Sequence, residues 1–359
     1  MLTAAPIPSR TTAIGPLPTL WMADALRRAQ GDVLALFGFG PSECRHRVIA
    51  SGARWRLRAY EGGSGPPLLI VAAPIKQPYI WDLAPPVSAV HLCLRHGFRV
   101  YLLEWTTPAP GDDDAGLAGY AWKSIGAAVA RVSRDAGGAR PFLLAHSLGG
   151  TLAAIYGALR SRSLRGLVLL AAPLCFERGS SRFRDSLVAM APPLVPETGI
   201  VPGSLLSQLS AVASPETFVW SRFVDAAVSV TDLGASEILA RVERWTLDEF
   251  PLPARLVREI LLWLYRENRF CAGALRVGNQ TLGPSSLRVP TLAVINSADG
   301  VAPSQSIVPF IAGMQPGQAT VLEHPGEIGV SLQHLAILIG RRAQVLVWPE
   351  IISWIHAHA

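Results

Sequence analysis

The sequence predicts an α/β protein whose mostly parallel, doubly wound sheet is interrupted late by a helical insertion. Apolar runs of strand length alternate with segments of helical periodicity through most of the chain, and this alternation stops over about residues 175–286. One apolar run also passes through a serine flanked by small residues directly into a helical segment. Continuous apolar runs are typical of parallel strands covered on both faces. Alternating strands and helices favour a doubly wound sheet.

The first part of this core is expected over residues 41–174. Its first two strands form a hairpin that turns at Ser51-Gly52-Ala53. The expected strands are 46–50, 55–61, 67–74, 98–105, 141–146 and 164–173. The expected helices are 87–96, 120–136 and 149–160.

The other divisions are an N-terminal tail with an amphipathic helix, a helical lid, and the second part of the core. They are expected over residues 1–40, 175–286 and 287–359. In the lid, Trp220, Trp245 and Trp263 are expected in the core rather than on a pocket wall, because aromatic residues of a buried helical insert usually pack there. The last division is expected to hold strands 291–296 and 319–323 and helices 304–314 and 349–356.

Composition disfavours several classes of protein. Half of the 359 residues are apolar and 16% are charged, which suits a large core and argues against global disorder. No apolar run reaches the roughly eighteen residues of a membrane span, and the N-terminus lacks a basic segment followed by an apolar one. We therefore expect a cytoplasmic protein without a transmembrane segment.

The net charge of +6 is spread over scattered arginines. This distribution disfavours nucleic-acid binding and suits anionic substrates such as acyl-CoA.

The cysteines give no sign of a metal site. Cys44, Cys93, Cys175 and Cys271 lie far apart and form no CxxC pair. We therefore expect free thiols in a reducing compartment and no structural zinc. Nothing in the sequence implies a metal or redox cofactor.

The segment 142–150, FLLAHSLGG, predicts a nucleophile. A serine on a tight strand-to-helix turn is held at strained backbone angles and needs small neighbours, which Ala145, Gly149 and Gly150 supply. A serine at a helix start is often only a cap, but here the preceding strand, the following helix and the place in the sheet agree. Ser147 is therefore the expected nucleophile, and the N–H of Leu148 is the expected first donor of an oxyanion hole.

The second oxyanion donor is expected in the loop after strand 67–74. Pro74 has no N–H to donate. The backbone N–H of Ile75 is therefore the candidate.

A serine hydroxyl needs a histidine base that a carboxylate orients, in the chain order serine, acid, histidine for this type of turn. Asp299 lies in a loop directly after a predicted strand, where that carboxylate is expected, and Glu177 is the reserve candidate. Among the eight histidines, His334 lies where the last long loop should deliver the base. His324, at the end of the final strand, is expected to be a structural histidine or a pocket wall. His146 adjoins the nucleophile, and its side chain is expected to point elsewhere.

Several segments resemble polyhydroxyalkanoate synthases. AAPIKQPYIWDL (72–83) resembles the entry to their first core helix, and HLAILIGRRA (334–343) resembles the region of their catalytic histidine. Further similar segments are 100–105, 116–120, 264–269 and 348–354. The resemblance implies the α/β-hydrolase fold, with Asp299 as the acid and His334 as the base. Two positions depart from the synthase pattern: Ser147 replaces the nucleophilic cysteine, and Gln333 replaces the glycine before the histidine.

These observations lead to three functional hypotheses. The first is a serine hydrolase that cleaves esters or thioesters of hydroxyacyl or other acyl groups through an acyl-enzyme. The second is an acyltransferase like the synthases, which would use hydroxyacyl-CoA. The third is a non-catalytic, granule-associated protein, which an intact triad would disfavour. The expected partners are an acyl ester or acyl-CoA substrate and, by the resemblance, a polyester granule surface and a second copy of the chain.

Overall fold

The computed structural model describes residues 17–109, 115–327 and 333–359. Within these ranges, eight strands form one sheet in the order β1-β2-β4-β3-β5-β6-β11-β12. The strands are β1 (His46–Gly52), β2 (Trp55–Tyr60), β3 (Pro67–Val71), β4 (Arg99–Trp105), β5 (Phe142–His146), β6 (Gly166–Leu170), β11 (Thr291–Asn296) and β12 (Ala319–His324). The predicted fold class, a mostly parallel sheet with an insertion, is confirmed.

The sheet is antiparallel only at one edge. β1 pairs antiparallel with β2, and β2 pairs antiparallel with β4, whereas every later pairing is parallel. Every residue of β3, β5 and β6 is buried, as their unbroken apolar sequences require. The carboxyl ends of the parallel strands therefore meet at one edge of the sheet, where α/β proteins place their ligand sites.

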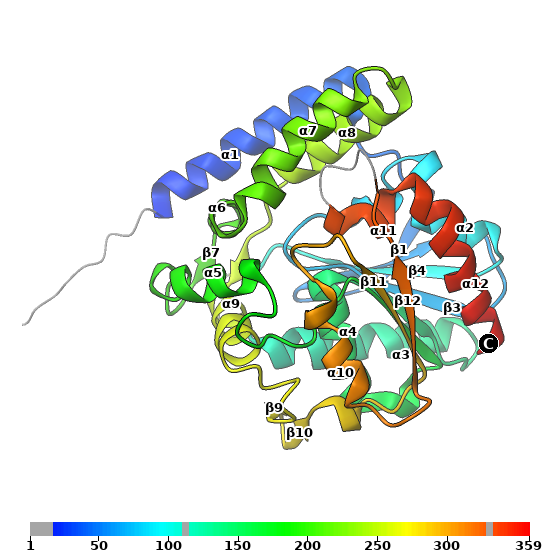
Figure 1. The fold of residues 1–359 in the computed structure, drawn as a ribbon. Coiled ribbons are helices and arrows are strands. Elements are labelled where there is room, and N and C mark those ends of the chain that lie inside the picture. The colour runs from blue at the N-terminus through cyan, green and yellow to red at the C-terminus, as the bar shows by residue number, and fades with distance from the viewer. Residues whose placement is uncertain (1–16, 110–114, 328–332) are drawn as a thin grey trace, which may run out of the picture.

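Helices cover both faces of the sheet (Figure 1). α3 and α4 lie on one side of it, and α2, α11 and α12 lie on the other. These helices and the short α10 are α2 (Ala89–Arg95), α3 (Ile125–Asp135), α4 (Ser147–Arg160), α10 (Val308–Ala312), α11 (Ala336–Ile339) and α12 (Trp348–Ala357). The core is thus a sheet between two helical layers, as right-handed crossovers produce.

The region between β6 and β11, residues 171–290, leaves the sheet and is called the inserted region below. It is mostly helical, with α5 (Arg182–Met190), α6 (Gly203–Ala213), α7 (Ser221–Ser229), α8 (Leu233–Leu247) and α9 (Ala254–Glu259). It also holds two short antiparallel strand pairs, which the sequence did not predict: β7 (Ile200–Val201) with β8 (Leu252–Pro253), and β9 (Leu275–Val277) with β10 (Gln280–Leu282).

The N-terminal helix α1 (Leu17–Leu34) belongs spatially to the inserted region. It packs against α6 and α8, and Figure 1 shows it beside α7 and α8 at the top of the view. The buried carboxylate of Asp24 accepts hydrogen bonds from the N–H groups of Gly203 and Ser204 at 3.2 and 2.8 Å. These are the first two residues of α6, so Asp24 satisfies helix-terminal donors that would otherwise be unpaired.

Most predicted elements are found with shifted ends. β3 ends at Val71 instead of residue 74, because the chain leaves the sheet there for a turn. The helix expected at 304–314 is divided into a 3₁₀ turn, Ser304–Ser306, and α10.

The tail at residues 1–16 lies outside the described residues. In the parts that the structure describes, no helix is both long and apolar enough to cross a membrane.

The expectation of four free thiols is wrong for two of them. Cys175 and Cys271 form a disulfide with a Cα–Cα distance of 5.0 Å, whereas Cys44 and Cys93 are free. The two residues are 96 positions apart, so sequence spacing gave no sign of the pairing. The bond joins the start of the inserted region to the segment after α9, and it therefore encloses all five of its α-helices.

Reduction of this disulfide is expected to lower the free energy of unfolding by about 2–4 kcal/mol, because a bond that closes a long loop restricts the unfolded chain. Urea unfolding curves with and without a phosphine reductant would measure the change. The Cys175→Ser variant should already unfold at the lower midpoint and should not respond to the reductant. Identical wild-type curves under both conditions would contradict this expectation.

Candidate active site

Ser147 lies at the junction between β5 and α4, at the carboxyl edge of the sheet. Its φ angle is +55°, a left-handed conformation that costs free energy for a residue with a Cβ. Such strain is characteristic of a nucleophile held on a tight strand-to-helix turn. The turn therefore has the backbone geometry that the sequence predicted.

The two glycines after Ser147 are required by close contacts. A Cβ on Gly149 would lie 2.5 Å from the carbonyl oxygen of Val71 and 2.9 Å from the nitrogen of Ala73, and one on Gly150 would lie 2.4 Å from the Cβ of Ala172. Glycine at position 149 thus lets the first turn of α4 lie directly against the loop that follows β3. The nucleophile and that loop are consequently neighbours.

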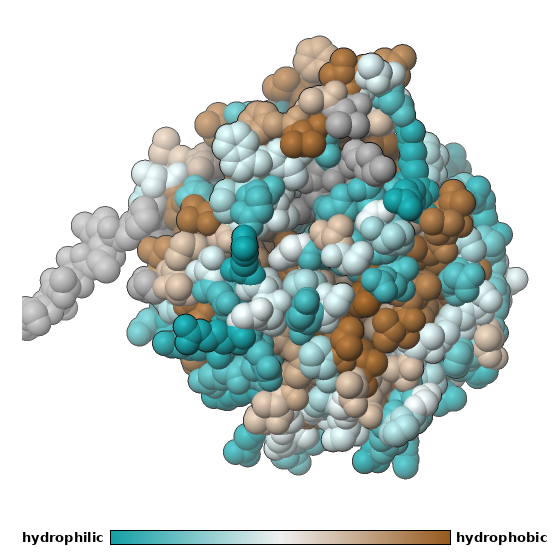
Figure 2. Space-filling model, in the orientation of Figure 1, coloured by the Kyte–Doolittle hydropathy of each residue, from teal (hydrophilic) through white to brown (hydrophobic). Residues whose placement is uncertain are grey.

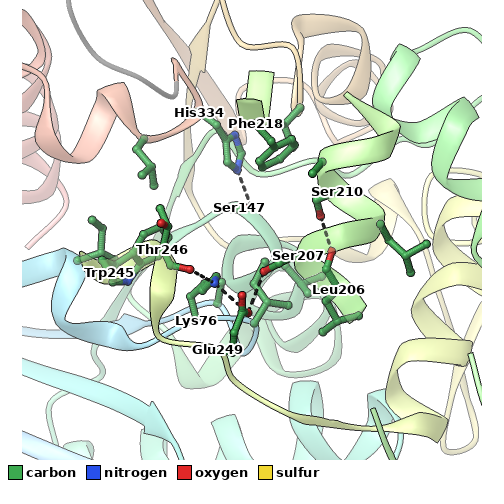
Figure 3. Close-up of a pocket in the computed structure, with 18 of the residues that line it drawn as sticks. Lys76, Ser147, Leu206, Ser207, Ser210, Phe218, Trp245, Thr246, Glu249 and His334 are labelled. Atoms are coloured by element: carbon green, nitrogen blue, oxygen red, sulfur yellow. Dashed lines mark hydrogen bonds and ion pairs between the residues drawn. The ribbon is translucent and has the colours of Figure 1, made fainter. Parts of the chain in front are cut away.

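Ser147, His334 and Asp299 form a chain of hydrogen bonds. The Ser147 hydroxyl lies 2.7 Å from Nε2 of His334, and Nδ1 of His334 lies 2.6 Å from Oδ2 of Asp299. His334 and Asp299 are both buried. Figure 3 shows the His334 ring directed at Ser147. The structure therefore brings together the three side chains that the sequence selected, although Ser147 and His334 are 187 positions apart in the chain.

Asp299 is held as an ionised acceptor. Its Oδ1 accepts hydrogen bonds from the N–H groups of Val301 and Ala302 at 2.8 and 3.1 Å. Burial acts to raise the pKa of Asp299, but the His334 side chain and these two N–H groups outweigh burial and hold the pKa below its usual value. A buried carboxylate with one oxygen fixed by the backbone can orient the imidazole with the other.

The backbone of His334 is fixed by a second set of bonds. Asn296 donates from Nδ2 to the carbonyl of Gln333 at 2.7 Å. The Gln333 side chain donates to the carbonyl of Glu327 at 2.8 Å and accepts from its N–H at 3.0 Å. A glycine at position 333 could make neither side-chain bond. Gln333 therefore anchors the segment that carries His334 through two bonds that glycine could not make.

His146 is a positioning residue that the sequence did not predict. Its Nε2 donates to the backbone carbonyl of His334 at 2.7 Å, and the two rings lie 4.7 Å apart. Burial, with a contribution from the charge of His334, lowers the pKa of His146 to about 3. His146 is thus neutral at physiological pH and holds the base through its backbone.

A depressed pKa in a histidine makes folding pH-dependent. The folded pKa of His146 is about 3 against an ordinary value of 6.5, so the unfolded chain binds an extra proton between these values. The free energy of unfolding should therefore fall as pH drops from 6.5 toward 3, with this residue contributing at most about 1.4 kcal/mol per pH unit. Urea unfolding at a series of pH values would measure the slope. The matched variant His146→Gln keeps a donor without titrating and should flatten the slope, and an unchanged slope would contradict the assignment.

The two expected oxyanion donors border the same cavity as Ser147. Leu148 is the second residue of α4, and Ile75 lies in the turn after β3, between Pro74 and Lys76. Trp105 donates from Nε1 to the carbonyl of Ala72 at 2.7 Å and so fixes the start of this loop. This arrangement favours both N–H groups as donors, and their role stays a prediction.

The reserve candidates lie elsewhere. Glu177 is exposed and takes no part in the hydrogen-bond chain. His324 is fully buried at the end of β12 and does not border the cavity, but neither of its ring nitrogens has a hydrogen-bond partner among the described residues, so the expectation of a satisfied structural histidine is wrong. Among the tryptophans, Trp245 is buried and borders the cavity, whereas Trp220 is 64% exposed. The expectation of a core position is therefore wrong for Trp220, which ends the helical segment Glu216–Trp220 directly before α7 and points most of its surface to solvent.

The cavity above Ser147 has a volume of about 390 Å³, within the range of small-molecule sites. Most of its wall is apolar and comes from the inserted region; examples are Phe183, Leu187, Leu206, Leu209, Phe218 and Leu261. His334, Ser147 and the loop after β3 form the opposite wall. In the described ranges, no group of three or more His, Cys, Asp or Glu side chains is placed to hold a metal ion. The arrangement places a mostly apolar cavity over a serine hydroxyl that is hydrogen-bonded to a buried imidazole.

Comparisons with known proteins give relatives among the polymerases. The poly(3-hydroxyalkanoate) polymerase subunit PhaC of Haloferax mediterranei is 28% identical over 86% of this chain and 63% of its own length. That of Haloarcula marismortui is 25% identical over 80% of this chain and 60% of its own length. The chain thus spans about three fifths of the length of these two relatives. The resemblance found in the sequence is confirmed.

The fold has solved counterparts. The monoacylglycerol lipase of Paleococcus ferrophilus is similar with a TM-score of 0.52 and 13% identity, over 85% of this chain and 99% of that one. A family model described as the alpha/beta hydrolase fold matches residues 84–328, more than half of the chain. The chain therefore belongs to the alpha/beta hydrolase fold family.

Proposed function

We propose that this protein is a serine esterase or thioesterase acting on hydroxyacyl or other acyl substrates. The observation that carries the proposal is the continuous hydrogen-bond chain from Ser147 through His334 to Asp299. A hydroxyl is a useful nucleophile at neutral pH only when a base accepts its proton. An apolar cavity above Ser147 supports an acyl group as the substrate moiety.

The reaction begins when His334 Nε2 accepts the Ser147 proton and Oγ attacks the carbonyl carbon. Asp299 stabilises the imidazolium that forms. The N–H groups of Leu148 and Ile75 stabilise the developing oxyanion. The carbon–oxygen or carbon–sulfur bond then breaks, and the leaving group takes the proton from His334. Water, deprotonated by His334, attacks the acyl-enzyme and releases the acid.

In this proposal the chain divides as the sequence predicted. Residues 41–174 and 287–359 form the catalytic core, residues 175–286 form a lid, and residues 1–40 include the helix that packs on it. The side chains that the inserted region contributes to the cavity wall support the lid assignment. The cytoplasmic location also stays a prediction, which the Cys175–Cys271 disulfide can test, because a reducing compartment would open this bond.

The second candidate is an acyltransferase that extends a polyester from hydroxyacyl-CoA, which the polymerase relatives favour. A granule surface would then be a partner. Large apolar side chains exposed on α1, α7 and the adjoining turns support such a surface (Figure 2). They are Met22, Leu26, Leu36, Phe37, Trp220, Phe223 and Val224. A homodimer through the same face is the alternative use of this patch.

Product analysis with 3-hydroxybutyryl-CoA separates the two candidates. The esterase proposal predicts free 3-hydroxybutyrate from the wild type and none from Ser147→Ala. Oligomer formed with the released CoA would overturn hydrolysis in favour of acyl transfer. Ser147→Cys is the matched variant, because a thiolate is a better leaving group for repeated transfer; a shift from acid toward oligomer would show that the nucleophile decides the product.

A further inference from the structure

Charged side chains occupy one part of the mostly apolar cavity. Lys76 Nζ donates to Oε2 of Glu249 at 3.0 Å and to the carbonyl of Thr246 at 2.6 Å. Arg27 donates from Nε to Oε1 of Glu249 at 2.7 Å and from Nη2 to the same Thr246 carbonyl at 3.0 Å. The Glu249 side chain has no exposed surface. Figure 3 shows Lys76 and Glu249 together beside the cavity, with Ser207 donating to the same carboxylate at 2.8 Å.

The cations of this cluster outnumber its carboxylates. Lys76 and Arg27 share the single carboxylate of Glu249. Arg222 also borders the cavity and pairs with Glu243. With all five side chains ionised, the cluster carries one positive charge in excess. Burial, with a contribution from the charge of Arg27, lowers the pKa of Lys76, and the carboxylate of Glu249 acts against this. Burial and the charge of Arg27 both lower the pKa of Arg222, as expected where cations lie close together without a full set of partners.

The cluster also has donors to spare. Lys76 has three N–H hydrogens, and the described residues provide acceptors for two of them. Arg27 uses Nε and Nη2, and the same part of the structure offers no acceptor for Nη1. The side chains of Lys76 and Arg27 are 14% and 32% exposed, so these donors border open space. Unused donors with excess positive charge are what a bound carboxylate or phosphate requires.

We propose that Arg27, Lys76 and Arg222 form a subsite for a free carboxylate of the substrate. The substrate is then an oligomer of hydroxyacids that are joined by ester bonds, with an unesterified carboxyl group at one end. This assignment rests on the proposed function. In such an oligomer the carboxylate of the leaving 3-hydroxyacid is two carbon atoms from the scissile ester oxygen. Lys76 directly follows Ile75 in the loop beside the nucleophile, and Arg27, Lys76 and Arg222 line the same cavity as Ser147.

A CoA phosphate offers the same chemistry but fits less well. The phosphates of CoA are separated from the thioester by the whole pantetheine arm. Ser147 and the cluster line one cavity, and a hydroxyacid dimer carries its scissile ester and its carboxylate within one short molecule. The bonds that form and break are those of ester hydrolysis: Ser147 takes the acyl group, and the second hydroxyacid leaves with the proton from His334.

The test compares the dimer of 3-hydroxybutyrate with its methyl ester, which has the same scissile bond and no charge. We expect kcat/KM for the free acid to exceed that for the methyl ester by about tenfold or more, as one charge-assisted bond allows. In Arg27→Gln this ratio should fall toward one. Because both substrates are measured on the same preparation, a partial loss of folded enzyme cancels in the ratio. Arg28→Gln, on the exposed side of α1, is the matched control and should keep the wild-type ratio.

Each other outcome has one meaning. Equal wild-type rates for the two substrates would overturn the carboxylate subsite and leave the proposed function intact. No cleavage of either substrate or of p-nitrophenyl butyrate would instead overturn the proposed function. A further experiment compares 3-hydroxybutyryl-CoA with the N-acetylcysteamine thioester of the same acid, which lacks the CoA phosphates. If the enzyme prefers the CoA thioester, loses that preference in Arg27→Gln and shows no preference for the dimer acid, the cluster binds a phosphate. This result would contradict our proposal.

Discussion

Ser147→Ala is expected to lower kcat/KM for ester hydrolysis by at least about 10⁴-fold, because no other group can form the acyl-enzyme. Ser147 is held at a positive φ and at 2.7 Å from the imidazole of His334. Alanine removes only a hydroxyl and should leave the fold unchanged. Initial rates with p-nitrophenyl butyrate would measure the loss.

Two observations accompany this prediction. The melting temperature of Ser147→Ala should equal or exceed that of the wild type. The substitution removes no apolar packing contact, and it removes one polar group from a strained turn. Ser210→Ala is the matched control, because Ser210 borders the same cavity and its hydroxyl donates to the carbonyl of Leu206 within α6. A Ser147→Ala enzyme that retains a tenth of the activity would show that another group attacks the substrate.

The second large effect is expected from Asp299→Asn, which should lower kcat/KM by about 10⁴-fold. Oδ1 of Asp299 accepts from two backbone N–H groups, so the asparagine oxygen would take that place and its NH₂ would face His334. The imidazole would then accept at Nδ1 and carry its proton on Nε2. In this tautomer His334 cannot accept the proton of Ser147.

The separate effects on kcat and KM distinguish this cause from simple misfolding. Loss of the correct tautomer should lower kcat and leave KM nearly unchanged, because the acyl cavity is not touched. Circular dichroism and the melting temperature would show whether the variant is folded. A folded Asp299→Asn enzyme with less than about a tenfold loss would contradict the role of Asp299 as the orienting carboxylate.

The serine turn could be predicted from the sequence because its determinants are local. A strand, small residues and a helix within nine positions specify a strained turn, and Gly149 and Gly150 are needed there for contacts that any side chain would prevent. Asp299 and His334 could be found because the fold fixes the order of the three groups along the chain. Residues that follow different parallel strands can meet in this fold, because the sheet brings the carboxyl ends of its strands together at one edge.

Features that depend on distant packing could not be predicted. His146 contacts the carbonyl of a residue 188 positions away, and nothing near it in the sequence indicates that bond. Arg27 and Glu249 are 222 positions apart, and their contact depends on how α1 packs against the inserted region. The Cys175–Cys271 bond likewise follows from the path of that region and not from a spacing pattern.

The exposed apolar face also escaped prediction. Aromatic residues of a buried helical insert usually pack in the core, which led to the expectation that Trp220 lies there. In the structure α7 packs against α8, and Trp220, directly before α7, and Phe223 within it are 64% and 65% exposed. Periodicity alone indicates an apolar face but does not say which partner covers it.

Covalent labelling with a fluorophosphonate tests the central claim most directly. The reagent phosphonylates only a serine whose proton is accepted by a neighbouring base, and fluoride leaves. Peptide mass spectrometry should find one adduct, on Ser147, and His334→Ala should label much more slowly. An unlabelled protein, or an adduct on a different serine, would show that Ser147 is not an activated nucleophile.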